Sequence, residues 1–303
     1  MLQKFILLET ISICGNIQGM KTSIIILTFN GLELNKKCID SILQNTEGDF
    51  EIIVVDNDSQ DGTVKYLKSL SDKQIRVIFN KENTGFARGN NQGAKRAIGD
   101  ILVFLNNDTE VTRGWLLPLQ NTLASKEISI AGPKLLYPDG KIQHAGVAFT
   151  DKGMPRHIYR RFDSNFPPAN RKKEYQAVTG ACLAIKKEIF DRVGGFDEKY
   201  INGLEDVDLC FKVRKSGFRV MYCPKSVVVH HESVGKDRFK YLYRNIEYYQ
   251  SKWPNVKADE DDIYRRDGFG SLFILRQHIS NRYLTGNYLA KTKTVLKKFL
   301  GRS

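Results

Sequence analysis

The strongest constraint on the fold is a series of short apolar runs that alternate with segments of helical spacing. The first two runs are almost continuously apolar, which is typical of strands buried on both faces of a sheet. The strand candidates are residues 23–27, 51–55, 75–79 and 100–105, and the helix candidates between them are residues 32–44, 63–70 and 90–98. This β-α-β-α order predicts an α/β protein with a mostly parallel sheet flanked by helices.

The remainder of the chain of 303 residues is less regular. Residues 128–235 contain frequent Gly and Pro turns, and residues 236–303 are rich in Tyr, Arg and Lys and predict a C-terminal helical extension. Within the first of these segments the candidates are a helix at 205–216 and strands at 219–223 and 227–229. Residues 1–20 fit a signal peptide poorly. We expect them to be a dispensable extension, with an interfacial anchor as the alternative.

The charge and cysteine content of the chain limit the kinds of partner and compartment to expect. The chain has 47 basic and 34 acidic residues, a net charge of +13, which favours a polyanionic partner such as nucleic acid, an anionic membrane surface or a phosphorylated substrate. The sequence contains no stretch of about 18 uncharged apolar residues, so it does not predict a membrane-spanning helix. The five cysteines form no C-x-x-C pair, which argues against a disulfide framework or a zinc ribbon and fits a reducing cytoplasm.

Polar residues follow each of the four predicted strands. Ligands of open parallel sheets bind at the carboxyl ends of the strands, so these residues predict a binding site at one edge. The clusters are residues 28–30, 56–58, 80–91 and 106–108. Helix capping and turns could explain any one cluster, but four at one edge favour a site.

The absence of two nucleotide-binding motifs excludes some classes of ligand. The sequence has no G-x-G-x-x-G after its first strand and no G-x-x-x-x-G-K-[ST], which argues against dinucleotide binding and P-loop chemistry. Asp56 could instead accept a hydrogen bond from a nucleotide base. Asp108 could bind Mg²⁺ or Mn²⁺, which prefer oxygen ligands and would neutralise a diphosphate.

Eight motifs follow one another along residues 22–253: the strand 23–30, VVDNDS (54–59), NTGFARGNN (83–91), LNND (105–108), TGACLAIK (179–186), GGFDE (194–198), EDVDL (205–209) and VHHES (229–233). In this combination and order they resemble family 2 glycosyltransferases, most closely the rhamnosyltransferase-like branch. The resemblance implies a Rossmann-like GT-A fold, a nucleotide-diphosphate-sugar donor, a divalent metal, and inversion at the anomeric carbon. Residues 21–235 would form the catalytic domain, with a donor half at 21–127 and an acceptor half at 128–235.

The resemblance also implies roles for individual positions. The residues that match donor contacts are Thr28, Asn30, Asp56, Asn57, Asp58, Asn83, Gly85, Arg88, Asn91, Asn106 and Asn107. Asp108 matches the last position of a D-x-D-type metal motif whose first position here is Asn106. A second metal ligand is expected at His230, with His231 as the alternative.

Asp206 matches the catalytic base, which would remove the proton from the acceptor hydroxyl during transfer. Glu205 and Asp206 open a helical pattern, where acidic side chains are favoured by the helix dipole alone, and this is the alternative explanation. Asp208 should point elsewhere on the same helix.

The basic tail at 291–302 surrounds an apolar stripe, which suits a helix lying on an anionic membrane and a lipid-linked acceptor. Alternatively, this segment packs against the catalytic domain or forms a contact between subunits of an oligomer. No RNA-binding module signature is present, so nucleic acid is not an expected partner. The expected location is the cytoplasm, at the inner face of the membrane.

These patterns predict an inverting, metal-dependent glycosyltransferase that moves rhamnose or another hexose to a glycan or lipid-linked acceptor in cell-surface polysaccharide synthesis. A nucleotide-sugar-forming nucleotidyltransferase is one alternative, although residues 28–32 lack the basic side chain expected after its first strand. A non-catalytic basic protein that binds anionic glycan or nucleic acid is the other.

Overall fold

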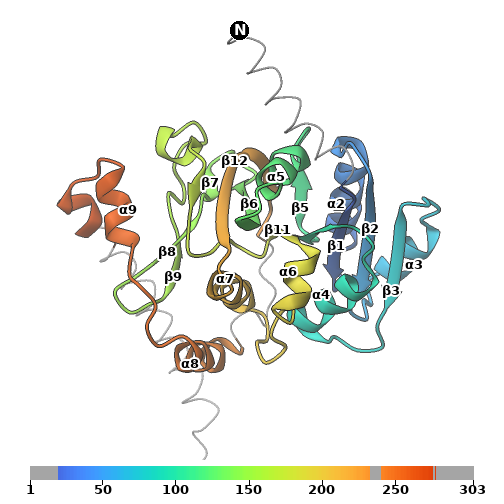
Figure 1. Ribbon diagram of the computed structural model, residues 1–303. Coiled ribbons are helices and arrows are strands. Elements are labelled where there is room, and N and C mark those ends of the chain that lie inside the picture. Colours follow the sequence, from blue (N-terminus) through green and yellow to red (C-terminus); the bar gives the residue numbers. More distant parts are fainter. Residues whose placement is uncertain (1–19, 233–239, 276, 278–303) are drawn as a thin grey trace, which may run out of the picture.

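A computed structural model of the protein describes residues 20–232, 240–275 and 277 (Figure 1). Residues 1–19 of the predicted extension and the basic tail at 291–302 lie outside these residues. In the part of the chain that is described, no helix is long and apolar enough to span a bilayer.

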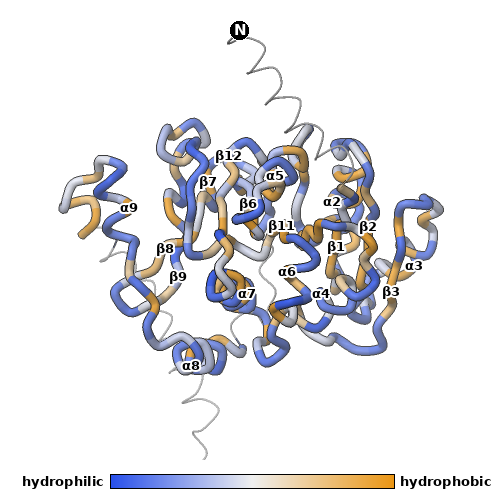
Figure 2. Tube along the Cα trace, in the orientation of Figure 1, coloured by the Kyte–Doolittle hydropathy of each residue, from blue (hydrophilic) through white to orange (hydrophobic). Residues whose placement is uncertain are grey.

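The expected parallel strands form one half of a central sheet. Their order is β3 (Ile75–Phe79), β2 (Phe50–Asp56), β1 (Thr22–Thr28) and β4 (Ile101–Asn106), and adjacent members are parallel. Their interior positions are almost fully buried in β1, β2 and β4, as the apolar runs require. Figure 2 shows the apolar residues concentrated along these central strands.

The other half of the sheet comes from the less regular segment. From β4 outward, the order is β11 (Cys182–Lys186), β6 (Ile128–Leu136), β12 (Arg219–His230) and β10 (Lys173–Glu174). β11 is antiparallel to both of its neighbours, and β12 is parallel to β6. The short strands are β5 (Thr109–Val111) on β12, β7 (Ile142–His144) on β6, and the separate pair β8 (Val147–Phe149) and β9 (Pro155–His157).

Helices cover both faces of the sheet. One apolar cluster joins β1 to α2 (Leu32–Asn45), α3 (Thr63–Ser69) and α5 (Leu116–Leu123). The other joins β1, β2 and β4 to α4 (Gly85–Arg96), α6 (Lys187–Arg192) and α7 (Glu205–Lys215). Neighbouring residues of β1 contribute to opposite clusters, Ile24 to the first and Ile25 to the second, as strand geometry requires.

Two predicted boundaries were wrong. The helix expected at 90–98 begins at Gly85, so the Asn- and Gly-rich motif forms its first two turns. Gly89 and Gly93 face Leu27 and Ile25 of β1, and any larger side chain would overlap them, so close packing outweighs poor helix propensity. The two strands expected at 219–223 and 227–229 are one strand, β12, with a register irregularity between Cys223 and Val227.

The C-terminal region is helical where it is described, as predicted. It contains α8 (Leu242–Lys252) and α9 (Glu260–Arg266). Tyr249 of α8 is buried in the same apolar cluster as α7, and Tyr264 of α9 joins an aromatic cluster with Tyr159 and Tyr222. α8 therefore packs against the sheet domain.

Candidate active site

Strand register brings the predicted polar residues to one edge of the sheet. Thr28 pairs with Asp56, and Leu27 pairs with Asn106, so the ends of β1, β2 and β4 are level. Asp56 is buried, and its Oδ2 accepts from the Ser59 amide at 3.2 Å. Its Oδ1 is buried without a hydrogen-bond partner among the described residues, and so can accept from a ligand.

Asn30, Asp58 and Asn107 hold the loops around this edge. Asn107 donates to Thr28 Oγ1 at 3.3 Å, and Asn30 Oδ1 accepts from the Gln60 amide at 2.7 Å. Asp58 has a φ of 69° and its Oδ1 accepts from Gln60 Nε2 at 3.0 Å. The side chains predicted to contact the donor thus also fix the loop geometry around it.

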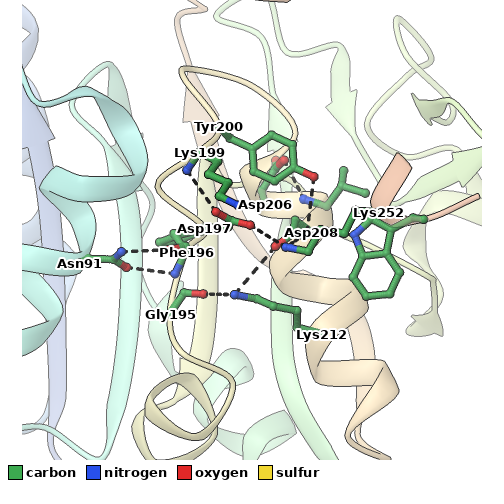
Figure 3. Close-up of polar contacts among 12 residues, drawn as sticks. Asn91, Gly195, Phe196, Asp197, Lys199, Tyr200, Asp206, Asp208, Lys212 and Lys252 are labelled. Atoms are coloured by element: carbon green, nitrogen blue, oxygen red, sulfur yellow. Dashed lines mark hydrogen bonds and ion pairs between the residues drawn. The ribbon is translucent and has the colours of Figure 1, made fainter. Parts of the chain in front are cut away.

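A second group of amides sets the start of α4. Asn57 Nδ2 donates to Asn83 Oδ1 at 3.2 Å, and Asn83 Oδ1 also accepts from the Gly85 amide at 3.0 Å. Arg88 is exposed on the second turn of the helix. Asn91 is bonded elsewhere: it accepts from the Phe196 amide at 2.9 Å and donates to the Phe196 carbonyl at 2.9 Å, which ties α4 to the loop after α6 (Figure 3).

Asp108 and His230 face each other. Asp108 Oδ1 lies 3.1 Å from His230 Nε2, and both side chains are almost fully buried. The other ring nitrogen of His230, Nδ1, is 2.6 Å from Gln143 Oε1, which can only accept a hydrogen bond. Nδ1 therefore carries the proton when the ring is neutral, and the Nε2 lone pair points at the carboxylate.

This donor set fits a divalent cation. Two ligands at right angles, each about 2.1 Å from a Mn²⁺ or Mg²⁺ ion, are separated by about 3.0 Å, close to the observed distance. His231 is directed elsewhere, with its Nε2 2.6 Å from Glu110 Oε1. Within the described ranges, no group of three or more His, Cys, Asp or Glu side chains is arranged for a metal.

Asp206 joins the same edge through β11. Its Oδ2 accepts from the Gly180 amide at 2.7 Å, and the carbonyl of Ala181, the next residue, accepts from the Asn106 amide at 2.9 Å. A Cβ atom at Gly180 would lie 3.0 Å from Asp206 Cβ, so the small residue lets the carboxylate approach the backbone. Asp56, Asp108 and Asp206 therefore share one edge of the sheet.

Comparison of the sequence with models of protein families identifies the family. Residues 23–194 match the model described as glycosyl transferase family 2, and residues 160–234 match the one described as the N-terminal domain of galactosyltransferase. The chain belongs to glycosyltransferase family 2. Membership favours glycosyl transfer over the nucleotidyltransferase and the non-catalytic binding protein.

Curated relatives include glycan-synthesis proteins. An uncharacterized protein of Sinorhizobium fredii is 34% identical over 80% of this chain and 30% of its own length. An O-antigen biosynthesis protein of Myxococcus xanthus is 32% identical over 71% of this chain and 18% of its own length. A low-salt glycan biosynthesis hexosyltransferase of Haloferax volcanii is 23% identical over 73% of this chain and 71% of its length. The transferase thus spans less than a third of the first two relatives.

Solved structures confirm the GT-A fold. GalNAc-T7, solved with UDP, GalNAc and Mn²⁺, superposes with a TM-score of 0.62 at 17% identity, over 88% of this chain and 57% of its own. A mannosyltransferase of Pyrobaculum calidifontis in complex with GDP-Man and Mn²⁺ gives 0.54 at 19% identity, over 91% and 80%.

Some site features of the transferase carry no sequence signal. Gln143, which orients His230, is a single amide in an irregular segment. The close approach of the Asp206 carboxylate to the backbone depends on Gly180, a glycine that the sequence does not distinguish from a turn residue. A surface pocket of about 620 Å³, lined by Met20, Ile98 and Lys186 among others, lies at the opposite edge of the sheet and contains none of the site residues.

The acidic residues at the start of α7 influence one another. Burial, and then the neighbouring Asp206 carboxylate, raise the pKa of Glu205 to about 8, while burial also raises the pKa of Asp206. Glu205 Oε2 accepts from the Gly203 amide at 2.6 Å. At neutral pH Glu205 therefore keeps its proton.

We expect Glu205→Gln to change the pH dependence of stability. The folded state holds a proton on Glu205 that the unfolded chain, with an ordinary pKa of 4.5, has released, so the Glu205 contribution is lost as pH rises toward about 8. Gln mimics the protonated form, so the variant should match the wild type near pH 5 and exceed it by roughly 1–3 kcal/mol near pH 8.5. Urea unfolding measures this, with exposed Glu247→Gln as the control; a difference that is constant with pH contradicts it.

Proposed function

We propose that this glycosyltransferase is an inverting, metal-dependent enzyme. In this proposal it moves rhamnose or another hexose from a nucleotide-diphosphate sugar to a glycan or lipid-linked acceptor in cell-surface polysaccharide synthesis. The observation that carries the proposal is the meeting of three groups at one edge: the buried carboxylate Asp56, the Asp108–His230 pair, and Asp206. The glycan-synthesis relatives support the acceptor class.

Two of these groups, Asp56 and the Asp108–His230 pair, bind the donor. Asp56 Oδ1 accepts from the nucleotide base, and the amides around Asn57 and Asn107 hold the loops that enclose it. Asp108 and His230 hold a divalent cation, which when bound offsets the negative charge of the diphosphate. The relatives of this fold that were solved with Mn²⁺ support that assignment.

Asp206 acts on the acceptor. Its carboxylate takes the proton of the acceptor hydroxyl as that oxygen attacks the anomeric carbon. The bond from the anomeric carbon to the diphosphate oxygen breaks, and its electron pair leaves with the nucleoside diphosphate. The hydrogen bond from the Gly180 amide aims the carboxylate, and its raised pKa makes it a stronger base than an exposed aspartate.

The metal assignment is tested by nucleotide binding. Calorimetry with UDP, GDP, dTDP and CDP, each with and without Mn²⁺, identifies the nucleotide that binds the wild type. Asp108→Ala and His230→Ala should each lower the Mn²⁺-dependent affinity by at least about tenfold, because even outer-shell changes at metal sites cost that much. His231→Ala is the matched control. Equal losses at His230 and His231, or unchanged metal dependence in Asp108→Ala, would contradict the assignment.

The base assignment is tested with Asp206→Asn. Nucleoside diphosphate affinity should stay within about twofold, while turnover of the corresponding nucleotide-sugar falls by roughly 10²–10⁴-fold, the usual contribution of a general base. Proton NMR of the product should show the anomeric configuration inverted relative to the donor. Wild-type turnover in this variant would remove Asp206 as the base, and a retained configuration would exclude the inverting mechanism.

We further propose that the enzyme works in the cytoplasm at the inner face of the membrane, held there by the basic segment 291–302. Deletion of the residues after Asn287 should release the protein from vesicles with phosphatidylserine, in a flotation assay with neutral phosphatidylcholine vesicles as the control. Binding that survives the deletion excludes this segment as the anchor.

A further inference from the structure

The loop that leads into the catalytic helix α7 has an unfavourable backbone. Asn202, Gly203 and Leu204 have φ angles of 53°, 145° and 74°, three consecutive positive values immediately before Glu205 and Asp206. Glycine adopts such angles freely and asparagine at modest cost, but Leu204 does so only under strain, so the conformation persists only where surrounding contacts impose it. Because this loop directly precedes Asp206, the residues that hold the loop also fix the position of the Asp206 side chain.

Asn245 of α8 supplies most of these contacts. This side chain is buried, and its Oδ1 accepts from the Ile201 amide at 3.3 Å. Its Nδ2 donates to the Ile201 carbonyl at 2.9 Å and to the Gly203 carbonyl at 3.1 Å. One side chain thus bonds to three backbone groups of the strained loop. On the other side, Asn202 Oδ1 accepts from the Phe86 amide of α4 at 3.2 Å.

The far end of α8 holds α7 at a second point. Lys252 Nζ lies 2.7 Å from Asp208 Oδ1 and 2.6 Å from Asp197 Oδ2 (Figure 3). The neighbouring Trp253 Nε1 donates to Asp208 Oδ1 at 2.9 Å. Asp208 is completely buried, so loss of Lys252 would leave its charge paired with Lys212 at the longer distance of 3.8 Å. As predicted, Asp208 points away from Asp206.

α8 therefore contacts the chain on both sides of the candidate base, before it at residues 201–203 and after it at Asp208. Both contacts come from a segment that neither family match covers, since the two matches end at residues 194 and 234. We propose that Asn245 is a positioning residue for catalysis: it fixes the loop at 201–204 and so the direction of the Asp206 carboxylate. This inference rests on the proposed function, in which Asp206 is the base.

The variants separate positioning from folding. Asn245→Ala removes all three bonds, and Asn245→Asp keeps the shape and the acceptor but cannot donate to the two carbonyls. Asn202→Gly removes the bond to Phe86 while relieving the strain at a φ of 53°, so it should fold with wild-type stability. Glu247→Gln, an exposed change on the same helix, is the control.

Two measurements give the test. Hydrogen-exchange mass spectrometry should show at least about tenfold faster exchange in peptides spanning 201–208 of the Asn245 variants, with β1, β2 and β4 unchanged. Steady-state kinetics with the nucleotide-sugar identified for the wild type, normalised to sites that bind the nucleoside diphosphate with Mn²⁺, should show kcat lowered by about 10–100-fold at unchanged donor KM. Asn202→Gly should show a smaller fall in kcat without a fall in melting temperature.

The outcomes are distinct. If kcat per binding site in the Asn245 variants equals that of Glu247→Gln, Asn245 serves the fold alone and the inference is overturned. If Asn245→Ala does not fold, Asn245→Asp decides the matter, because it keeps the side-chain shape and the bond from the Ile201 amide and loses the two bonds to the carbonyls. If Asp206→Asn keeps wild-type turnover, the base assignment fails first, whatever the Asn245 variants do.

Discussion

Parallel pairing of β1 with β2 and β4 is the constraint on which the site depends. It places Thr28 beside Asp56 and Leu27 beside Asn106, so the polar residues that follow three strands meet at one edge. A one-residue change in register would move the strand ends apart and turn every buried side chain to the other face. The apolar interior of the strands thus fixes where the polar chemistry occurs, and β11 adds Asp206 by pairing with β4.

The first four residues of α7 include three acids, Glu205, Asp206 and Asp208, and each has a different environment. Glu205 is buried and holds its proton near neutral pH, as its raised pKa of about 8 indicates. Asp206 accepts hydrogen bonds from backbone amides of Gly180 and Val207. Asp208 is paired with Lys252. Of the three acids, Asp206 is the one whose carboxylate is bonded to Gly180 at the shared edge of the sheet, as the proposed base requires.

Local patterns predicted the parallel strands and the polar edge, because burial on both faces leaves continuous apolar runs and strand ends leave polar ones. They failed for α4, where packing of Gly89 and Gly93 against β1 overrides weak helix propensity. They could not indicate Gln143 or Asn245, since these contacts join residues 87 and about 44 positions apart and depend on the folded topology. A single amide in either segment looks like any surface residue.

The attachment of α8 to the loop before α7 has a consequence for how members of this family can be recombined. Consider a chimeric transferase in which the chain up to residue 234 comes from one relative and the remainder from another. The loop at 201–204 would then come from one parent and α8, which bonds to it, from the other. Residues 242–253 are therefore best inherited together with the loop at 201–208. In evolutionary terms, the two segments should vary as one unit even though some 40 residues separate them in the chain.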